Sequence, residues 1–297
     1  MDPIHRRRPE SYDIRIGTEV QASTAWTAPG GTLGRLVKEA RRRADALTGR
    51  RSELEQAAAG VADAAPFGAA LRRRDVAVIA EVKRRSPSKG WINPGMSAVE
   101  QAAAYAAGGA AAISVLTEPD HFGGSVDDLV AVRDRVALPV LKKDFHVDPI
   151  QLLEAKAIGA SAALLIVRAL SPDSLVELVR AADDLQLEVL LEVRDLDELQ
   201  RALDASSASS AATTIGVNNR NLETLVIDAG RAEEVIARIP ARFVAIFESG
   251  VSQRGDVERA ANGHADAILV GSAVSAATDP SAAVRGLTNV PRQPRVD

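Results

Sequence analysis

Eight short apolar segments, separated by amphipathic stretches, recur along most of the chain and limit its possible folds more than any other feature. Their spacing is about 30 residues, the size of one βα unit. Each segment is rich in Val, Ile, Leu and Ala, as is typical of strands that are buried on both faces. The segments are 76–82, 111–116, 140–143, 162–167, 188–193, 214–217, 243–247 and 267–270.

Two architectures alternate strands with helices in this way, the open doubly wound sheet and the closed barrel. An open sheet typically has a glycine-rich turn after its first strand. This chain instead has the polar segment Lys83–Gly90 at that point. Eight alternations within 297 residues therefore predict an α/β fold, a (β/α)8 TIM barrel with an N-terminal helical extension.

The predicted barrel spans residues 67–288 and is preceded by two regions of different character. Residues 1–31 have no sustained periodicity and are expected to be an irregular or disordered tail. Residues 32–66 contain apolar positions at helical spacing and are expected to form helices that cover part of the barrel. Residues 289–297 are expected to be a C-terminal tail.

Several helix starts can be located from their capping residues. Ser125 is expected to cap a helix over 126–132, and Ser171 one that runs to Leu185. Ser252 is expected to begin the helix that contains residues 257–261. The Ser/Ala-rich segment 205–214 is expected to be a loop at the bottom of the barrel, without a function.

The composition excludes several functional classes. The net charge of −4 and pI near 5.7 give no global electrostatic reason to bind nucleic acid or an acidic membrane. The absence of cysteine excludes disulfides and thiolate chemistry. No apolar run is long enough to span a bilayer, and residues 1–30 lack the apolar segment of a secretory signal. A cytoplasmic protein is expected, with no nucleic-acid or membrane partner.

Polar residues stand at most of the predicted strand ends, where barrel enzymes build their active sites. Residues two apart on a strand share a face, so Glu81 and Lys83 should point the same way. The same alternation predicts that Lys143 faces inward and Lys142 outward. The set is Glu81, Lys83, Lys143, Glu192, Asn218, Arg220, Glu248, Ser249, Gly271 and Ser272. Burying so many ionisable groups together is costly unless a ligand or a reaction uses them.

Glycine at the last two strand ends indicates a phosphate site. Gly250 and Gly271 would let backbone N–H groups approach an anion, and phosphate sites after strands seven and eight recur in this fold. No two histidines have metal-ligand spacing, so no metal is expected. His121 and His146 are predicted to be solvated or to contact substrate.

Several segments in the same order resemble those of the indole-3-glycerol phosphate synthase family. The resemblance covers residues 33–287 approximately. It rests on 79–90, 113–118, 122–125, 143–145, 215–222 and 248–251. The resemblance implies ring closure, decarboxylation and dehydration of 1-(2-carboxyphenylamino)-1-deoxyribulose 5-phosphate to indole-3-glycerol phosphate, without a cofactor.

The family likeness also implies a role for each site residue. Lys143 would be the general acid and Glu192 its partner in proton transfer, with desolvation or nearby cations lowering the pKa of the lysine. Lys83 would hold the substrate carboxylate and is the second candidate for the acid, with Glu81 orienting and tuning it; the division of acid work between Lys143 and Lys83 stays open. Asn218 and Ser249 would belong to the catalytic set and hydrogen-bond the reacting sugar hydroxyls. The other residues would bind substrate: Arg220 and Glu248 through local charge, Phe122 and Phe145 as a sandwich around the ring, and Ser86, Gly250, Gly271 and Ser272 at the phosphate.

Three alternatives stay open at this point. Two are other phosphate-binding barrels, a phosphoribosylanthranilate isomerase or a ribulose-phosphate epimerase, although Lys83, Lys143 and Glu192 together argue against both. The third is a non-catalytic barrel that binds a similar ligand or serves as a scaffold. The protein is expected to be a monomer or a weak homo-oligomer whose partner is a small sugar phosphate.

Overall fold

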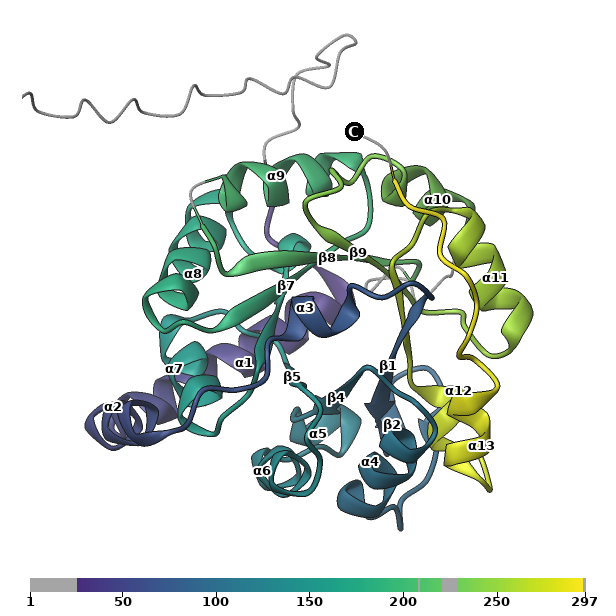
Figure 1. The fold of residues 1–297 in the computed structure, drawn as a ribbon. Helices are drawn as coiled ribbons and strands as arrows, with labels where there is room; N and C mark the ends of the chain where they lie inside the picture. Colours follow the sequence, from purple (N-terminus) through teal and green to yellow (C-terminus); the bar gives the residue numbers. More distant parts are fainter. Residues whose placement is uncertain (1–25, 208, 221–228, 296–297) are drawn as a thin grey trace, which may run out of the picture.

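The computed structural model describes residues 26–207, 209–220 and 229–295 and contains a closed eight-stranded parallel barrel (Figure 1). The strand order is β1-β10-β9-β8-β7-β6-β5-β4, and β4 pairs with β1 to close the ring. The strands are β1 (Ala77–Val82), β4 (Ala112–Leu116), β5 (Val140–Lys143), β6 (Ala162–Ile166), β7 (Glu188–Val193), β8 (Ala212–Asn218), β9 (Val244–Glu248) and β10 (Ala267–Val270). The predicted barrel is confirmed, and the open sheet is excluded.

Helices form a ring around the strands in Figure 1. The longer ones are α4 (Ala98–Ala107), α6 (Val126–Arg135), α7 (Pro149–Ala157), α8 (Pro172–Asp184), α9 (Leu196–Ser206), α10 (Ala229–Ile236), α11 (Arg254–Asn262) and α13 (Pro280–Arg285). Short elements at the strand ends are α5 (Pro119–Phe122), the 3-10 turn η1 (Val167–Ala169) and α12 (Ser272–Ser275). None of the helices in the described part of the chain is long and apolar enough to cross a membrane.

The capping predictions are confirmed at two helices and wrong at a third. The hydroxyls of Ser125 and Ser171 accept backbone N–H bonds at the starts of α6 and α8. Helix α11 is instead capped by Gln253, which forms a reciprocal capping box with Asp256. Ser252 lies one residue too early, and its hydroxyl donates to Asp256 Oδ2 at 2.9 Å.

The covering region consists of α1 (Gly31–Thr48) and α2 (Arg51–Gly60), followed by α3 (Phe67–Leu71). Helix α1 begins one residue before the predicted start and buries the expected stripe: Leu33, Leu36, Val37, Ala40 and Ala44. Helix α3 lies at the opposite end of the barrel, where Glu188 at the start of β7 accepts from Phe67 N at 2.8 Å. The two ends of the barrel are therefore covered by different helices.

The Ser/Ala-rich segment is shorter as a loop than predicted. Helix α9 continues to Ser206, and β8 already begins at Ala212. Thr213 belongs to this strand, and its hydroxyl donates to Glu188 at 2.6 Å. Ala212 and Thr214 lie in a strand because they pair with β7 and are buried there. This tertiary effect overrides the local composition.

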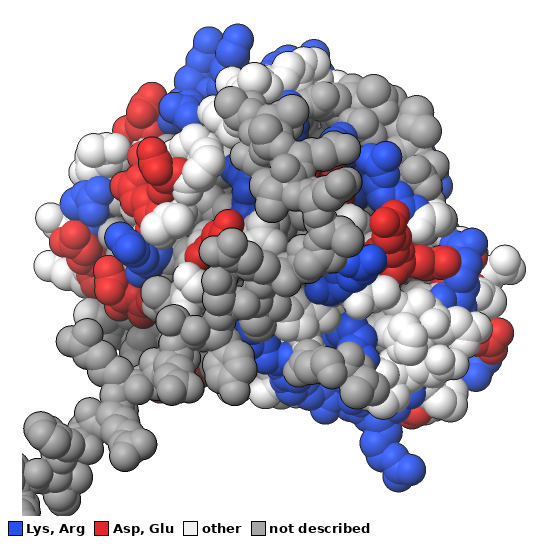
Figure 2. Space-filling view, turned by 90° about the horizontal axis from the view of Figure 1, so that it is seen from above, with Lys and Arg blue, Asp and Glu red and all other residues white. Residues whose placement is uncertain are grey.

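The C-terminal residues lie against the bottom of the barrel. Val76 N donates to Val290 O at 2.8 Å, and Arg295 binds Asp266 at 2.6 Å. Arg292 also pairs with Asp266. On the face seen in Figure 2, basic and acidic side chains are interspersed, in keeping with 36 Lys and Arg against 40 Asp and Glu. His5 and the three consecutive arginines that follow it, Arg6, Arg7 and Arg8, lie outside the described residues.

Candidate active site

A pocket of about 530 Å³ opens at the C-terminal ends of the strands. All the site residues predicted from the sequence line it: Glu81, Lys83, Ser86, Phe122, Lys143, Phe145, Glu192, Asn218, Arg220, Glu248, Ser249, Gly250, Gly271 and Ser272. They come from many strand ends because parallel closure brings all carboxyl ends to one rim. The sequence therefore predicted which residues meet, although not how they pair.

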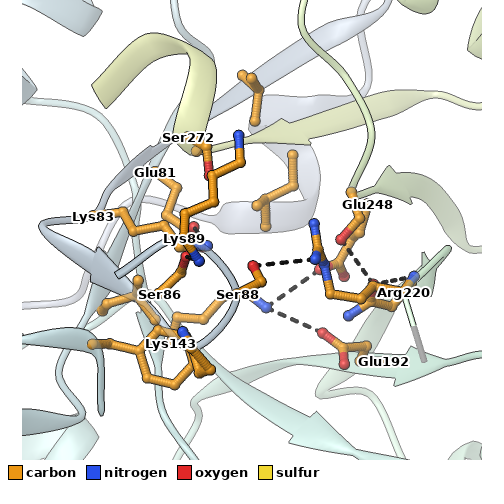
Figure 3. Close-up of a pocket in the computed structure, with 18 of the residues that line it drawn as sticks. Glu81, Lys83, Ser86, Ser88, Lys89, Lys143, Glu192, Arg220, Glu248 and Ser272 are labelled. Carbon is orange, nitrogen blue, oxygen red and sulfur yellow. Dashed lines mark hydrogen bonds and ion pairs between the residues drawn. The ribbon is translucent and has the colours of Figure 1, made fainter. Parts of the chain in front are cut away.

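Lys143 lies between two carboxylates at the centre of this pocket. Its Nζ is 3.1 Å from Glu192 Oε2 and 3.3 Å from Glu248 Oε2 (Figure 3). The preceding Lys142 faces the other side of β5, and its Nζ lies 2.7 Å from Glu154 Oε2 on α7. Strand alternation thus assigned the inward lysine correctly.

The charges around Lys143 shift its pKa in the opposite direction from the one expected. Burial lowers the pKa of this ammonium, but the carboxylates of Glu192, Glu248 and Glu81 outweigh burial and raise it above the ordinary lysine value. The expectation of a lowered pKa was wrong, because the nearest charged groups are anionic. Lys143 is therefore fully protonated, the form that a general acid requires.

The pKa of Glu248 is also raised above its ordinary value. Burial raises its pKa to about 8, with Glu192 adding to the rise and Lys143 opposing it. Its Oε1 atom is buried without a hydrogen-bond partner among the described residues. Because Glu248 is buried next to a second carboxyl group, its pKa lies near the neutral range, so this side chain is able to carry a proton during a reaction.

Two glycines make room for the carboxylates. A Cβ added at Gly216 on β8 would lie 2.0 Å from Glu248 Oε1, and one added at Gly271 would lie 2.4 Å from Glu81 Oε1. Each carboxylate therefore lies directly over the backbone of the neighbouring strand. The second glycine was predicted as a phosphate contact, and the structure gives it this additional steric reason.

Lys83 and Glu81 form the second ion pair of the pocket. Lys83 Nζ lies 3.1 Å from Glu81 Oε1 and 5.9 Å from the centroid of the Phe122 ring. The backbone of Glu81 is held from behind, since its carbonyl accepts from Tyr105 Oη at 3.2 Å and from Ser275 Oγ at 3.0 Å. This buried network fixes the end of β1 and hence the position of the pair.

Phe122 and Phe145 form one aromatic wall. Their ring centroids are 6.2 Å apart and their planes are inclined by 41°. This is the geometry of two rings in direct contact. A substrate ring sandwiched between them would require the two rings to separate. Without such a movement it would lie against the wall they share.

The opposite wall is a polar chain that starts on β8. Asn218 Oδ1 accepts from Ser249 Oγ and from Arg220 N, each at 2.9 Å. Arg220 Nη1 in turn donates to Ser88 Oγ at 3.2 Å, across the pocket mouth (Figure 3). Ser249 and Gly250 have φ values of 66° and 82°. This left-handed turn is unusual for serine and directs the backbone of the turn toward the pocket.

Sequence reasoning missed several residues of the pocket. Lys89 also lines the pocket and adds a third lysine to it (Figure 3). Its position within the motif 79–90 was the available signal. Thr32 and Leu36 reach the pocket from α1, which the sequence predicted as a covering helix but not as part of the site. Asp144, which follows Lys143 in the chain, also lines the pocket.

Neither predicted histidine faces the pocket. His146 is buried, and burial lowers its pKa to about 3 while its Nδ1 lies 2.7 Å from Leu164 O. The expectation that it is solvated or contacts substrate was wrong. His121 Nε2 lies 2.8 Å from Glu39 Oε2 on α1. Glu118 lies beside His121 and Glu39, close enough for the three side chains to share a metal ion. The Glu118 carboxylate, however, already accepts three backbone N–H groups at the start of α5.

Fold and site define an acid–base enzyme of the (β/α)8-barrel class. The family model described as indole-3-glycerol phosphate synthase matches residues 33–287. The chain is 48% identical to indole-3-glycerol phosphate synthase 1 of Streptomyces coelicolor, over 82% of this chain and 88% of that protein. It is 44% identical to the Rhodococcus jostii synthase, over 81% and 88%. The chain belongs to the indole-3-glycerol phosphate synthase family, and it is a decarboxylating lyase.

Solved structures with low identity share the fold alone. The 3-hexulose-6-phosphate synthase of Salmonella typhimurium has a TM-score of 0.55 at 18% identity, covering 71% of this chain and 96% of that one. KGPDC from Streptococcus mutans has the same TM-score at 14% identity, covering 72% and 95%. The family match removes the isomerase, the epimerase and the non-catalytic barrel as leading alternatives.

Proposed function

We propose that this pocket converts 1-(2-carboxyphenylamino)-1-deoxyribulose 5-phosphate into indole-3-glycerol phosphate, carbon dioxide and water, with Lys143 as the general acid. The observation that carries the proposal is the position of Lys143 between Glu192 and Glu248, at 3.1 and 3.3 Å. Ring closure needs an acid, and the later dehydration needs an acid and a base. One buried cation beside two carboxyls supplies both kinds of group.

In the first step Lys143 gives a proton to the ribulose carbonyl oxygen while the carboxyl-bearing ring carbon attacks the carbonyl carbon. The ring carboxylate then leaves as carbon dioxide, and the electrons of the broken bond restore aromaticity. In the last step the new hydroxyl leaves as water, with a proton supplied by an acid and another removed by Glu192. Glu248 is available as a second proton carrier, because its pKa is about 8.

The remaining residues orient the substrate. Lys83 binds the ring carboxylate, and Glu81 keeps the ammonium in place at 3.1 Å. Phe122 and Phe145 contact the ring. Asn218 and Ser249 bind the sugar hydroxyls, with Arg220 at the mouth.

The phosphate lies at the backbone of Ser249–Gly250 and Gly271–Ser272, with Ser86 adding a hydroxyl. Support comes from the lysine at residue 89, which adds positive charge to the same lining. Such a substrate carries a phosphate that does not cross a bilayer unaided, so we infer that the enzyme works in the cytoplasm.

The proposal is tested with the purified protein by the fluorescence of the indole product. The wild-type protein should turn over the substrate, and Lys143→Ala should lower kcat by at least about a hundredfold while inorganic phosphate still inhibits or binds as before. No turnover by the wild type at saturating substrate contradicts the proposed function. A loss of only a few fold in Lys143→Ala would assign the acid role to Lys83.

A further inference from the structure

Arg43 on α1 links the two loops that carry the aromatic wall. Its Nη2 lies 2.8 Å from Asp144 Oδ1, and its Nη1 lies 3.5 Å from Glu118 Oε1. The two carboxylates are buried, whereas about a quarter of the Arg43 side chain is exposed. One guanidinium therefore bridges acidic groups at the ends of β4 and β5.

Each of these carboxylates fixes the backbone of one ring of the wall. Glu118 Oε2 accepts from Phe122 N at 3.1 Å and from His121 N at 2.7 Å. Asp144 Oδ1 accepts from Phe145 N at 2.8 Å. The spacing of the two rings thus depends on the spacing of the two carboxylates.

Further contacts make this arrangement specific. Asp144 Oδ2 accepts from Thr117 Oγ1 at 2.7 Å, and Thr117 N donates to Lys143 O at 3.1 Å. The same carboxylate is thereby tied to both strand ends. Burial raises the pKa of Asp144, but Lys142 and Arg43 outweigh burial and lower it, so the group stays ionised.

We propose that Arg43 is a positioning residue that sets the gap between Phe122 and Phe145, and thereby the affinity for the aromatic end of the ligand. This inference rests on the proposed function, in which the wall contacts the substrate ring. Without the guanidinium, the two buried negative charges lose the cation that bridges them, and their repulsion separates the loops. The phosphate end, on β9 and β10, is separated from β4 by β1 and, within the described part of the chain, does not contact Arg43, so it keeps its geometry.

The test compares a ring-bearing ligand with a ring-free one in the full chain. Arg43→Met keeps the length of the side chain and removes its charge. Calorimetry with indole-3-glycerol phosphate should show binding weakened by about tenfold or more, whereas inorganic phosphate should bind within about twofold of wild type. In turnover, KM should rise by a similar factor, and kcat should change by less than about threefold.

Three further variants separate positioning from stability. Arg42→Met, exposed on the same helix, should match wild type in both titrations. Arg43→Lys reaches one carboxylate and should recover part of the affinity, and it serves as the test if Arg43→Met does not fold. Glu118→Gln in the Arg43→Met background should also recover affinity, because one of the repelling charges is gone.

Equal loss of both ligands in Arg43→Met, or loss of neither, overturns the inference. A fall in kcat with unchanged KM also overturns it. The binding titrations do not depend on turnover. If the wild type fails to turn over substrate but the ring-bearing ligand loses affinity selectively, the proposed function fails while the role of Arg43 stands.

Discussion

Lys142 and Lys143 are consecutive residues whose ammonium groups lie on opposite sides of strand β5. Lys142 Nζ reaches Glu154 on α7 at 2.7 Å, and Lys143 Nζ reaches Glu192 at 3.1 Å inside the barrel. Both lysines are largely buried. The same chemical group therefore has a structural role at one position and a chemical role at the next.

Lys142→Met should destabilise the protein and leave the chemistry intact. The substitution leaves Glu154 without its partner, which costs roughly 3 to 5 kcal/mol for a buried pair. Urea unfolding should show this loss, and kcat should stay within about threefold of wild type. A large fall in kcat at unchanged stability would mean that the outward lysine also serves the reaction.

Gly216→Ala should lower activity by roughly ten- to a hundredfold, because the new Cβ would lie 2.0 Å from Glu248 Oε1 and push that carboxyl away from Lys143. Steady-state kinetics measures this effect. The control is Gly255→Ala in α11, where an added Cβ meets nothing within 4 Å and helix stability rises by about 0.5 to 1 kcal/mol. Unchanged kcat in Gly216→Ala would show that Glu248 is free to move.

Glu248→Gln should flatten the dependence of stability on pH. The folded pKa of Glu248 is about 8 and its ordinary value is 4.5, so between these values the folded protein holds a proton that the unfolded chain has released. This contribution is complete below about pH 4.5 and is lost as the pH rises through 8.

Thermal unfolding of wild type and variant from pH 5 to 9 checks the sign. The difference in unfolding free energy should move in favour of the variant by at most about 1.4 kcal/mol per pH unit as the pH rises. A difference that moves in favour of wild type would contradict a raised pKa.

Arg295→Ala should weaken the bottom of the barrel without touching the pocket. Arg295 donates to Asp266 at 2.6 Å and to the carbonyls of Phe243 and His264, each at 2.7 Å. Their loss should cost about 2 kcal/mol or more in unfolding free energy, with KM and kcat unchanged. Arg238→Ala, at an exposed arginine of the same region, should stay within about 0.5 kcal/mol of wild type.

The barrel was predictable because its strands are buried on both faces and therefore appear as unbroken apolar runs. Alternation along β5 was enough to distinguish Lys143 from Lys142. The direction of the Lys143 pKa shift was not predictable, since it depends on how closely Glu192 and Glu248 approach from strands 49 and 105 residues away. The contact between Arg43 and Asp144 was unpredictable for the same reason, because these residues are 101 positions apart in the sequence.

Local ambiguity explains the remaining errors. Ser252 and Gln253 both precede α11, and Asp256 Oδ2 accepts from the backbone N–H of each, at 2.8 and 3.1 Å. A capping residue was visible in the sequence, but its exact position was not. The position of His146 after β5 was evident from the sequence, but nothing in the local pattern indicated that its side chain would be buried.

Because Gly216 and Gly271 have no side chains, the carboxylates of Glu248 and Glu81 fill the space that a Cβ at those positions would need. The size of residue 216 and the length of residue 248 are therefore not independent. Glu248→Ala vacates the space that an alanine at 216 would fill, so the double variant should pack better than Gly216→Ala alone. Attempts to move new chemistry into this barrel have to change such positions as pairs.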